Sequence, residues 1–165
     1  MKISWKETFQ SFVDDLIEHV YQWPPHERTT LSILKLIEHR QRTLGLREFP
    51  DYGCYYIQLA QIIDHFLKEA THTSPDLSWF CKFWETNSHG ESHSIQNVLI
   101  TYKQNRVIFK KYVLERNPEK VQHYCQSAIT CSRHMFHASP ERIETFNLLT
   151  GESHIEWSNP NQYVS

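Results

Sequence analysis

The chain has 165 residues, of which 39% are apolar, and its 17 basic and 19 acidic side chains give a formal net charge of −2. This length supports one domain that buries roughly two thirds of its unfolded surface, and this charge gives no general attraction to nucleic acid or to an anionic membrane, so a nucleic-acid partner is left open but is not indicated. The four cysteines are scattered, which predicts reduced thiols and a cytoplasmic protein. We find no signal peptide and no apolar run of membrane length, so no membrane partner is expected. We find no glycine-rich phosphate motif, and no cofactor is expected.

The first 71 residues are predicted to form three amphipathic helices. Apolar side chains recur at helical spacing over residues 4–22, 26–44 and 52–71, which gives each stretch an apolar face. Trp23-Pro24-Pro25 ends the first helix, because proline has no amide hydrogen to donate and its ring obstructs the preceding turn. The third stretch has the densest apolar stripe, and we expect it to lie in the core.

Three further helices are predicted from a start signal that occurs three times. Residues 74–76 (SPD), 117–119 (NPE) and 139–141 (SPE) each place a capping side chain before a proline at the first helical position and an acid in the first turn. The first signal predicts a short helix that ends near Glu85. The second predicts a helix that reaches Met135, and the third predicts one that Gly151 closes.

Residues 94–116 are predicted to form a central helix that is apolar on two sides. One broad face is continuous at helical spacing, and three apolar residues recur at every seventh position on the back: Ile100, Val107 and Leu114. Such a helix usually lies at the centre of a bundle or is shared with a partner. Five basic side chains of this segment are interpreted as its solvated face: Lys103, Arg106, Lys110, Lys111 and Arg116.

The alternative for the same segment is a β-hairpin. Its strands would cover residues 97–102 and 106–114, where β-branched side chains are frequent, and its turn would be residues 103–105 (KQN). We favour the helix because this turn contains no glycine and because the helical apolar face is continuous except at Asn105 and Arg106. The predicted fold is therefore all-α, a single domain of six or seven helices over residues 1–157 around a central two-faced helix, with a C-terminal tail at 158–165.

The predicted function is a non-catalytic protein-interaction module, an adaptor or regulatory subunit. Trp79 and Phe83 lie off the apolar stripe of the predicted fourth helix, four positions apart and on the same side. Large aromatic side chains beyond those that a core needs are typical of partner surfaces. The partner would be another protein or a second copy of the chain, and it would dock on this helix and on the second stripe formed by Ile100, Val107 and Leu114.

An enzyme is the main alternative. The segment RNPEKVQHY contains Arg116-Asn117 followed by His123-Tyr124, and it resembles the arginine-to-histidine signature of HEPN-type ribonucleases, which are small all-α domains. The resemblance implies metal-independent RNA cleavage, with Arg116 holding the phosphate and His123 moving a proton. Pro118 departs from the pattern, because it places the start of a helix between the two residues.

A zinc-stabilised binding domain is the third interpretation. Cysteine and histidine are the ligands that structural zinc sites use, and four such residues lie close together in the sequence: Cys125, Cys131, His134 and His137. His134 and His137 can share one face of a helix. The two cysteines are six positions apart, unlike the ligand pairs of common zinc motifs, so the alternative without metal is two buried thiols and two exposed histidines.

Overall fold

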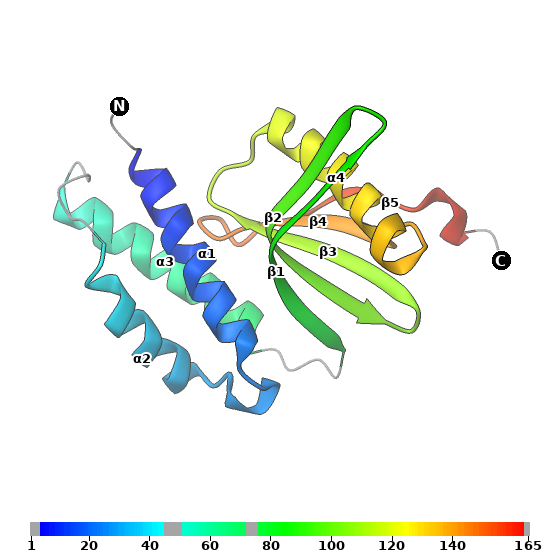
Figure 1. Ribbon diagram of the computed structural model, residues 1–165. Helices are drawn as coiled ribbons and strands as arrows, with labels where there is room; N and C mark the ends of the chain where they lie inside the picture. Colours follow the sequence, from blue (N-terminus) through cyan, green and yellow to red (C-terminus); the bar gives the residue numbers. More distant parts are fainter. Residues whose placement is uncertain (1–3, 45–50, 72–75, 164–165) are drawn as a thin grey trace. The chain divides into compact units, whose positions relative to one another are not determined.

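The computed structural model describes residues 4–44, 51–71 and 76–163. Three helices come first, followed by three strands, a fourth long helix and two more strands (Figure 1). The prediction of an all-α helical bundle is therefore wrong, because half of the chain folds around a five-stranded sheet. The elements are α1 (Trp5–Gln22), η1 (Pro25–Glu27), α2 (Thr30–Gln41), α3 (Tyr52–Ala70), β1 (Leu77–Ser88), β2 (Glu91–Lys103), β3 (Arg106–Val113), α4 (Pro118–Phe136), β4 (Arg142–Asn147), β5 (Ser153–Ser158) and η3 (Pro160–Tyr163).

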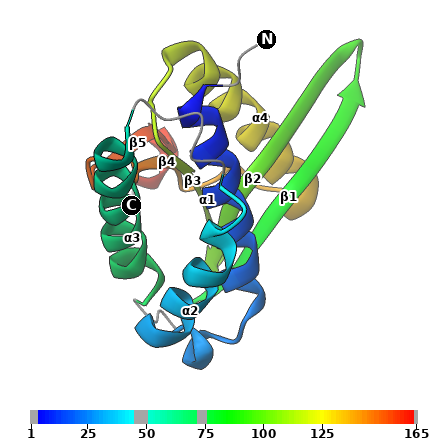
Figure 2. The same cartoon turned by 90° about the vertical axis from the view of Figure 1, so that its left-hand side faces the viewer.

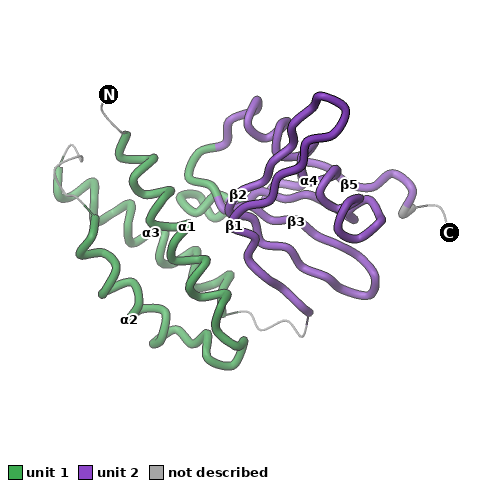
Figure 3. The backbone as a smooth tube through the Cα atoms, in the orientation of Figure 1, with its two compact units in different colours: residues 1–74, 113–115, 147–152 green, residues 75–112, 116–146, 153–165 purple. Residues whose placement is uncertain are grey.

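The chain forms two compact units (Figure 3). The helical unit contains residues 1–74 together with two short pieces, 113–115 and 147–152, from later in the chain. The sheet unit contains the remaining residues, 75–112, 116–146 and 153–165.

The first and third helix predictions for the helical unit are confirmed almost to the residue. Ser4 caps α1 in a capping box with Glu7, and Asp51 caps α3 by accepting a hydrogen bond from the Cys54 amide at 2.6 Å. The second helix is shorter than predicted: η1 occupies residues 25–27, and α2 then begins after its own cap at Thr29. The apolar faces predicted for α1 and α3 are buried as expected.

The two late pieces of the helical unit are fastened to its helices by specific hydrogen bonds. The Leu114 amide donates to Gln10 Oε1 at 3.0 Å, and His65 Nδ1 donates to the Leu148 carbonyl at 2.7 Å. Gly151 has φ 74°, and a Cβ at this position would lie 2.8 Å from the His65 ring. Gly151 therefore makes a tight turn against α3, where the sequence had predicted the end of a helix.

The sheet has the strand order β1-β2-β3-β4-β5. The pairs β1–β2, β2–β3 and β4–β5 are antiparallel. The Glu141 amide donates to the Val107 carbonyl, and seven residues further on the Leu148 amide donates to the Val113 carbonyl, six residues after Val107. Because both partners advance in the same direction, β4 runs parallel to β3, and α4 is the crossover that parallel strands require.

Residues 94–116 form most of the β2–β3 hairpin, so the predicted central helix is wrong and the alternative is confirmed. Its turn residues Gln104 and Asn105 both have positive φ, 49° and 61°, as a two-residue turn of type I′ requires. Asparagine tolerates this conformation, and Asn105 Oδ1 accepts a hydrogen bond from Tyr102 Oη at 2.8 Å. The turn therefore forms without glycine.

Only one of the three predicted helix start signals begins a helix. Asn117 Oδ1 accepts hydrogen bonds from the amides of Glu119 and Lys120 at 3.0 and 3.1 Å, which caps α4 as predicted. The signal at 139–141 leads instead into β4. Ser74 and Pro75 lie outside the described residues, and the segment after them is β1. Both segments are rich in aromatic or β-branched side chains, which favour strands.

One face of the sheet packs against α4 (Figure 1). Ile95 and Val98 of β2 both join this core, although an odd spacing would place them on opposite faces of a regular strand. Asn97 between them has φ 55° and resets the alternation. The buried cluster on this face is Ile95, Val98, Ile100, Val107, Phe109, Tyr124, Ala128, Cys131 and Ile143.

The β1–β2 hairpin extends beyond the other strands of the sheet unit (Figure 2). β3 pairs with residues 99–103 of β2, whereas β1 pairs with β2 along its whole length. The distal half of the hairpin is therefore a two-stranded arm. No helix among the described residues has the length and apolar character needed to cross a membrane.

Candidate functional site

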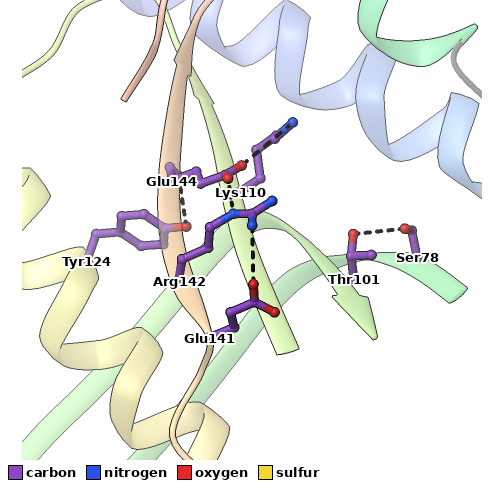
Figure 4. Close-up of polar contacts among 7 residues, drawn as sticks. All are labelled: Ser78, Thr101, Lys110, Tyr124, Glu141, Arg142 and Glu144. Carbon is purple, nitrogen blue, oxygen red and sulfur yellow. Dashed lines mark hydrogen bonds and ion pairs between the residues drawn. The ribbon is translucent and has the colours of Figure 1, made fainter. Parts of the chain in front are cut away.

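A pocket of about 320 Å³ lies on the sheet unit, lined mainly by side chains of β2, β3 and β4. We call it the ion-pair pocket, because four basic and three acidic side chains line it. Figure 4 shows Lys110, Arg142, Glu141 and Glu144 among them. The basic ones are Lys103, Arg106, Lys110 and Arg142, and the acidic ones are Asp76, Glu141 and Glu144. Thr101 lines it as well, and its hydroxyl is hydrogen-bonded to that of Ser78 at 2.9 Å. Leu99 and Ile108 supply apolar surface.

The charges of the ion-pair pocket are arranged in two layers. The three acidic side chains are only 10–18% exposed, whereas the four basic side chains are 24–56% exposed. The carboxylates therefore form the inner layer and hold the cations in place. The surface that meets solvent is formed mainly by ammonium and guanidinium groups.

Arg142 connects two of the carboxylates (Figure 4). Its Nε donates to Glu144 Oε1, and its Nη1 lies 3.3 Å from Glu141 Oε1. Lys110 Nζ lies 3.8 Å from Glu144 Oε2, and the Tyr124 hydroxyl of α4 donates to the Glu144 backbone carbonyl at 3.4 Å. Glu144 is thus held through its side chain by two cations and through its backbone by the α4 face of the core.

A second pocket, of about 310 Å³, lies beside the start of α4. We call it the α4 pocket. It is lined by Lys111 of β3, Lys120 and His123 of α4, and residues 94–96 of β2, with Tyr124 against it. Lys111 Nζ lies 5.7 Å from the centre of the Tyr124 ring, and burial raises the pKa of the Tyr124 hydroxyl well above its usual value. His123 and the two lysines are groups that can hold a phosphate and move a proton.

The two residues of the predicted ribonuclease pair, Arg116 and His123, take part in different contacts. Arg116 donates two hydrogen bonds to the carboxylate of Glu156 on β5, at 2.9 and 2.7 Å. The Thr145 hydroxyl also donates to Glu156, whose side chain is only 4% exposed. Both contacts lower the pKa of the Glu156 carboxyl group, and the hydrogen bond from Arg116 has the larger effect. His123 lines the α4 pocket. The structure therefore places Lys111 and Lys120 beside His123 and engages Arg116 in an ion pair.

The four residues of the zinc alternative lie along α4 and at its end. Burial raises the pKa of the Cys125 thiol to about 11 and that of the Cys131 thiol to about 12, which disfavours the thiolate that zinc binds. His134 contacts the Trp84 ring at a centroid distance of 5.8 Å, and His137 ends the helix with φ 56°. Within the described residues, no group of three or more His, Cys, Asp or Glu side chains is arranged to hold a metal ion.

The predicted partner-binding residues divide into buried and accessible ones. Ile100 and Val107 belong to the core beneath α4, and Leu114 is buried in the helical unit. The second stripe was a product of reading two strands as one helix, and its side chains are not on the surface. Trp79 and Phe83 lie on β1: Trp79 packs against Phe136 at 5.7 Å between ring centroids, and Phe83 is 55% exposed.

β1 is an edge strand, because its neighbour in the sheet order is β2 alone. It has 12 residues, of which two are charged, Lys82 and Glu85. Leu77 is 66% exposed, which adds a second accessible apolar side chain to Phe83. A long edge strand with few charges presents backbone donors and acceptors that another strand can pair with.

The predicted helices do not bring the residues of the ion-pair pocket together. The basic side chains of β2 and β3 are predicted on the solvated face of one helix, and the residues of β4 are predicted in another. The signal that could have found them is period-two alternation: Arg106, Ile108 and Lys110 share one face of β3, with Val107 and Phe109 on the other. Arg142 and Glu144 alternate in the same way around Ile143 on β4.

Comparison with known proteins gives no match to a protein-family model, to a curated protein or to a solved structure.

Proposed function

We propose that the protein is a non-catalytic protein-interaction module that binds an extended segment of a partner protein along the edge strand β1. The observation that carries the proposal is the exposure of Phe83 and Leu77 on a long strand at the end of the sheet order. In strand addition, main-chain hydrogen bonds supply affinity and alternate side chains supply specificity. β1 offers both features.

The support behind β1 favours a preformed docking strand. Trp79 packs on Phe136, and Trp84 packs on His134, both from α4. Tyr102 of β2 stacks on the same Phe136 ring at 6.1 Å. These contacts fix the strand before a partner arrives, which lowers the entropy cost of binding.

Charge and proline are the usual means by which proteins protect an exposed sheet edge. β1 contains no proline, and its two charged residues are Lys82 and Glu85. Its first five residues, 77–81, are uncharged. An edge of this composition is suited to a partner strand that alternates polar and apolar side chains.

The test is native mass spectrometry of the tagged protein purified gently from its native host. We expect the wild type to retain a stoichiometric second chain and Phe83→Lys to lose it. Ile155→Lys is the matched control, because Ile155 is 65% exposed on the opposite edge strand β5. Equal retention by the two variants would refute docking at β1, and a bare monomer for the wild type would refute a stable module.

Metal-independent RNA cleavage is the second candidate function, and the α4 pocket favours it. Lys111, Lys120 and His123 line one pocket there, so the two lysines would hold the phosphate in place of Arg116, with His123 moving the proton. The assay is cleavage of single-stranded RNA in the presence of EDTA. His123→Ala should reduce the rate by about 10²–10⁴-fold, while His134→Ala, at an exposed position on the same helix, should leave it unchanged.

A further inference from the structure

The ion pairs inside the pocket leave hydrogen-bond donors of its basic side chains available to a ligand. Arg106 Nη1 lies 3.9 Å from Glu141 Oε2, beyond hydrogen-bonding distance, so this guanidinium keeps donors for another acceptor. Lys103 pairs with Asp76 at 3.3 Å and is 51% exposed. Four basic and three acidic side chains line the pocket, which gives it a formal net charge of +1.

The inner carboxylates hold Arg142 in place, whereas Arg106 lies beyond hydrogen-bonding distance of Glu141. Glu144 and Glu141 bind Arg142 from the protein side, where they are 10% and 18% exposed. Because Arg106, Arg142 and Lys103 are more exposed than the carboxylates, a ligand approaching from solvent meets these three cations first. Guanidinium groups that are held in a fixed plane match the geometry of a phosphate, because two parallel N–H groups can bind two of its oxygens.

The other residues that line the pocket indicate which group a ligand would carry besides its phosphate. Leu99 and Ile108 line the pocket with apolar side chains, and Thr101 lines it with a hydroxyl that is hydrogen-bonded to the Ser78 hydroxyl. A volume of about 320 Å³ lies at the lower end of the range for small-molecule sites. We propose that the ion-pair pocket binds a small phosphate monoester, with the phosphate on Arg106, Arg142 and Lys103 and a compact apolar or hydroxylated group over Leu99 and Ile108.

This inference is independent of docking at β1, because the three cations that would contact the phosphate lie on β2, β3 and β4. The test is a calorimetric titration of the full-length protein with phenyl phosphate at constant ionic strength. Benzoate is the matched carboxylate and inorganic phosphate is the matched fragment. We expect saturable binding of phenyl phosphate, tighter than that of inorganic phosphate, and no competition by benzoate at the same concentration.

Arg106→Gln is the decisive variant, because Arg106 is 56% exposed and its loss leaves the Arg142 network intact. We expect it to weaken phenyl phosphate binding about tenfold, the effect of losing one charge-assisted hydrogen bond. Lys103→Gln should weaken binding in the same direction. Arg133→Gln, an exposed position on α4 outside the pocket, should bind as the wild type does. Equal affinities for Arg106→Gln and Arg133→Gln, or equal binding of benzoate, would overturn the proposal.

Discussion

The helical unit and the sheet unit differ in charge and in how directly their local sequence specifies their structure. The helical unit contains eight basic and twelve acidic residues, whereas the sheet unit contains nine basic and seven acidic ones. In the helical unit, caps and apolar periodicity agree, and they place α1 and α3 correctly. In the sheet unit, the successive residues Val98, Leu99 and Ile100 of β2 are all buried, so the apolar–polar alternation that identifies a strand disappears there.

The difference teaches that a short run of apolar residues is ambiguous when both faces of an element are buried. Successive apolar residues in such a run satisfy helical spacing as well as strand pairing. The two basic residues that flank the β2–β3 turn and the two charged residues of β4 then acquire a shared surface that the helical reading separates. The ion-pair pocket therefore exists only because these segments are strands.

The largest effect that can test the comparison is the loss of a core side chain beneath α4. Phe109 is fully buried, so Phe109→Ala should lower the free energy of unfolding by about 3–5 kcal/mol, through lost burial and the cavity that remains. Urea unfolding followed by circular dichroism measures this change. Phe83→Ala, at an exposed position, is the control. Similar small losses for both variants would contradict the placement of the core.

The capping residues test how much a helix cap contributes in each unit, compared with a serine that precedes a strand. Ser4→Ala removes the cap of α1 and Asn117→Ala that of α4, and each should lower the free energy of unfolding by about 1 kcal/mol. Ser139→Ala changes the first residue of a triplet that precedes a strand, and it should cost less than either. Chemical denaturation of the three variants side by side decides the point. A cost at Ser139 equal to that at Asn117 would indicate a helix after residue 139.

A glycine substitution in the β2–β3 turn should change the free energy of unfolding in opposite directions for a hairpin and for a helix. Gln104 has φ 49°, which glycine adopts without strain, so Gln104→Gly should raise the free energy of unfolding by about 0.5–1 kcal/mol. In the middle of a helix, the same change would lower it by about 1 kcal/mol. A shift of the urea midpoint measures the direction. A lower midpoint would contradict the hairpin.

The smallest expected effect concerns the acid sensitivity of the sheet unit. Arg116 lowers the pKa of Glu156 below its usual 4.5, so the folded state binds a proton at this site less readily than the unfolded state does. The resulting stability is present above pH 4.5 and is lost as the pH falls through the lowered pKa. Glu156→Gln should therefore make the loss of stability between pH 5 and pH 3 shallower. Parallel curves for variant and wild type would show that the ion pair makes no contribution to acid unfolding.

The sequence was sufficient for the helices with strong local signals and for part of the candidate surface. Trp79 and Phe83 were selected because they lie off an apolar stripe, and Phe83 is accessible on β1, although the element is a strand. Ile100 and Val107 were selected from a seven-residue spacing that has no meaning across a turn at Gln104. Arg142 and Glu144 could not be assigned to a shared site, because only the parallel pairing of β4 with β3 brings them beside Lys110.

The two late pieces of the helical unit determine the order in which the chain can complete its fold during synthesis. α1, α2 and α3 leave the ribosome first. The hydrogen-bond partner of Gln10, Leu114, is translated 104 residues later, and that of His65, Leu148, is translated 83 residues later. The helices therefore remain without these partners until nearly the whole sheet has been translated. A fragment that stops after α3 would lack both pieces, so we expect the isolated helices to be sensitive to proteases and chaperone-dependent in a way that the full chain is not.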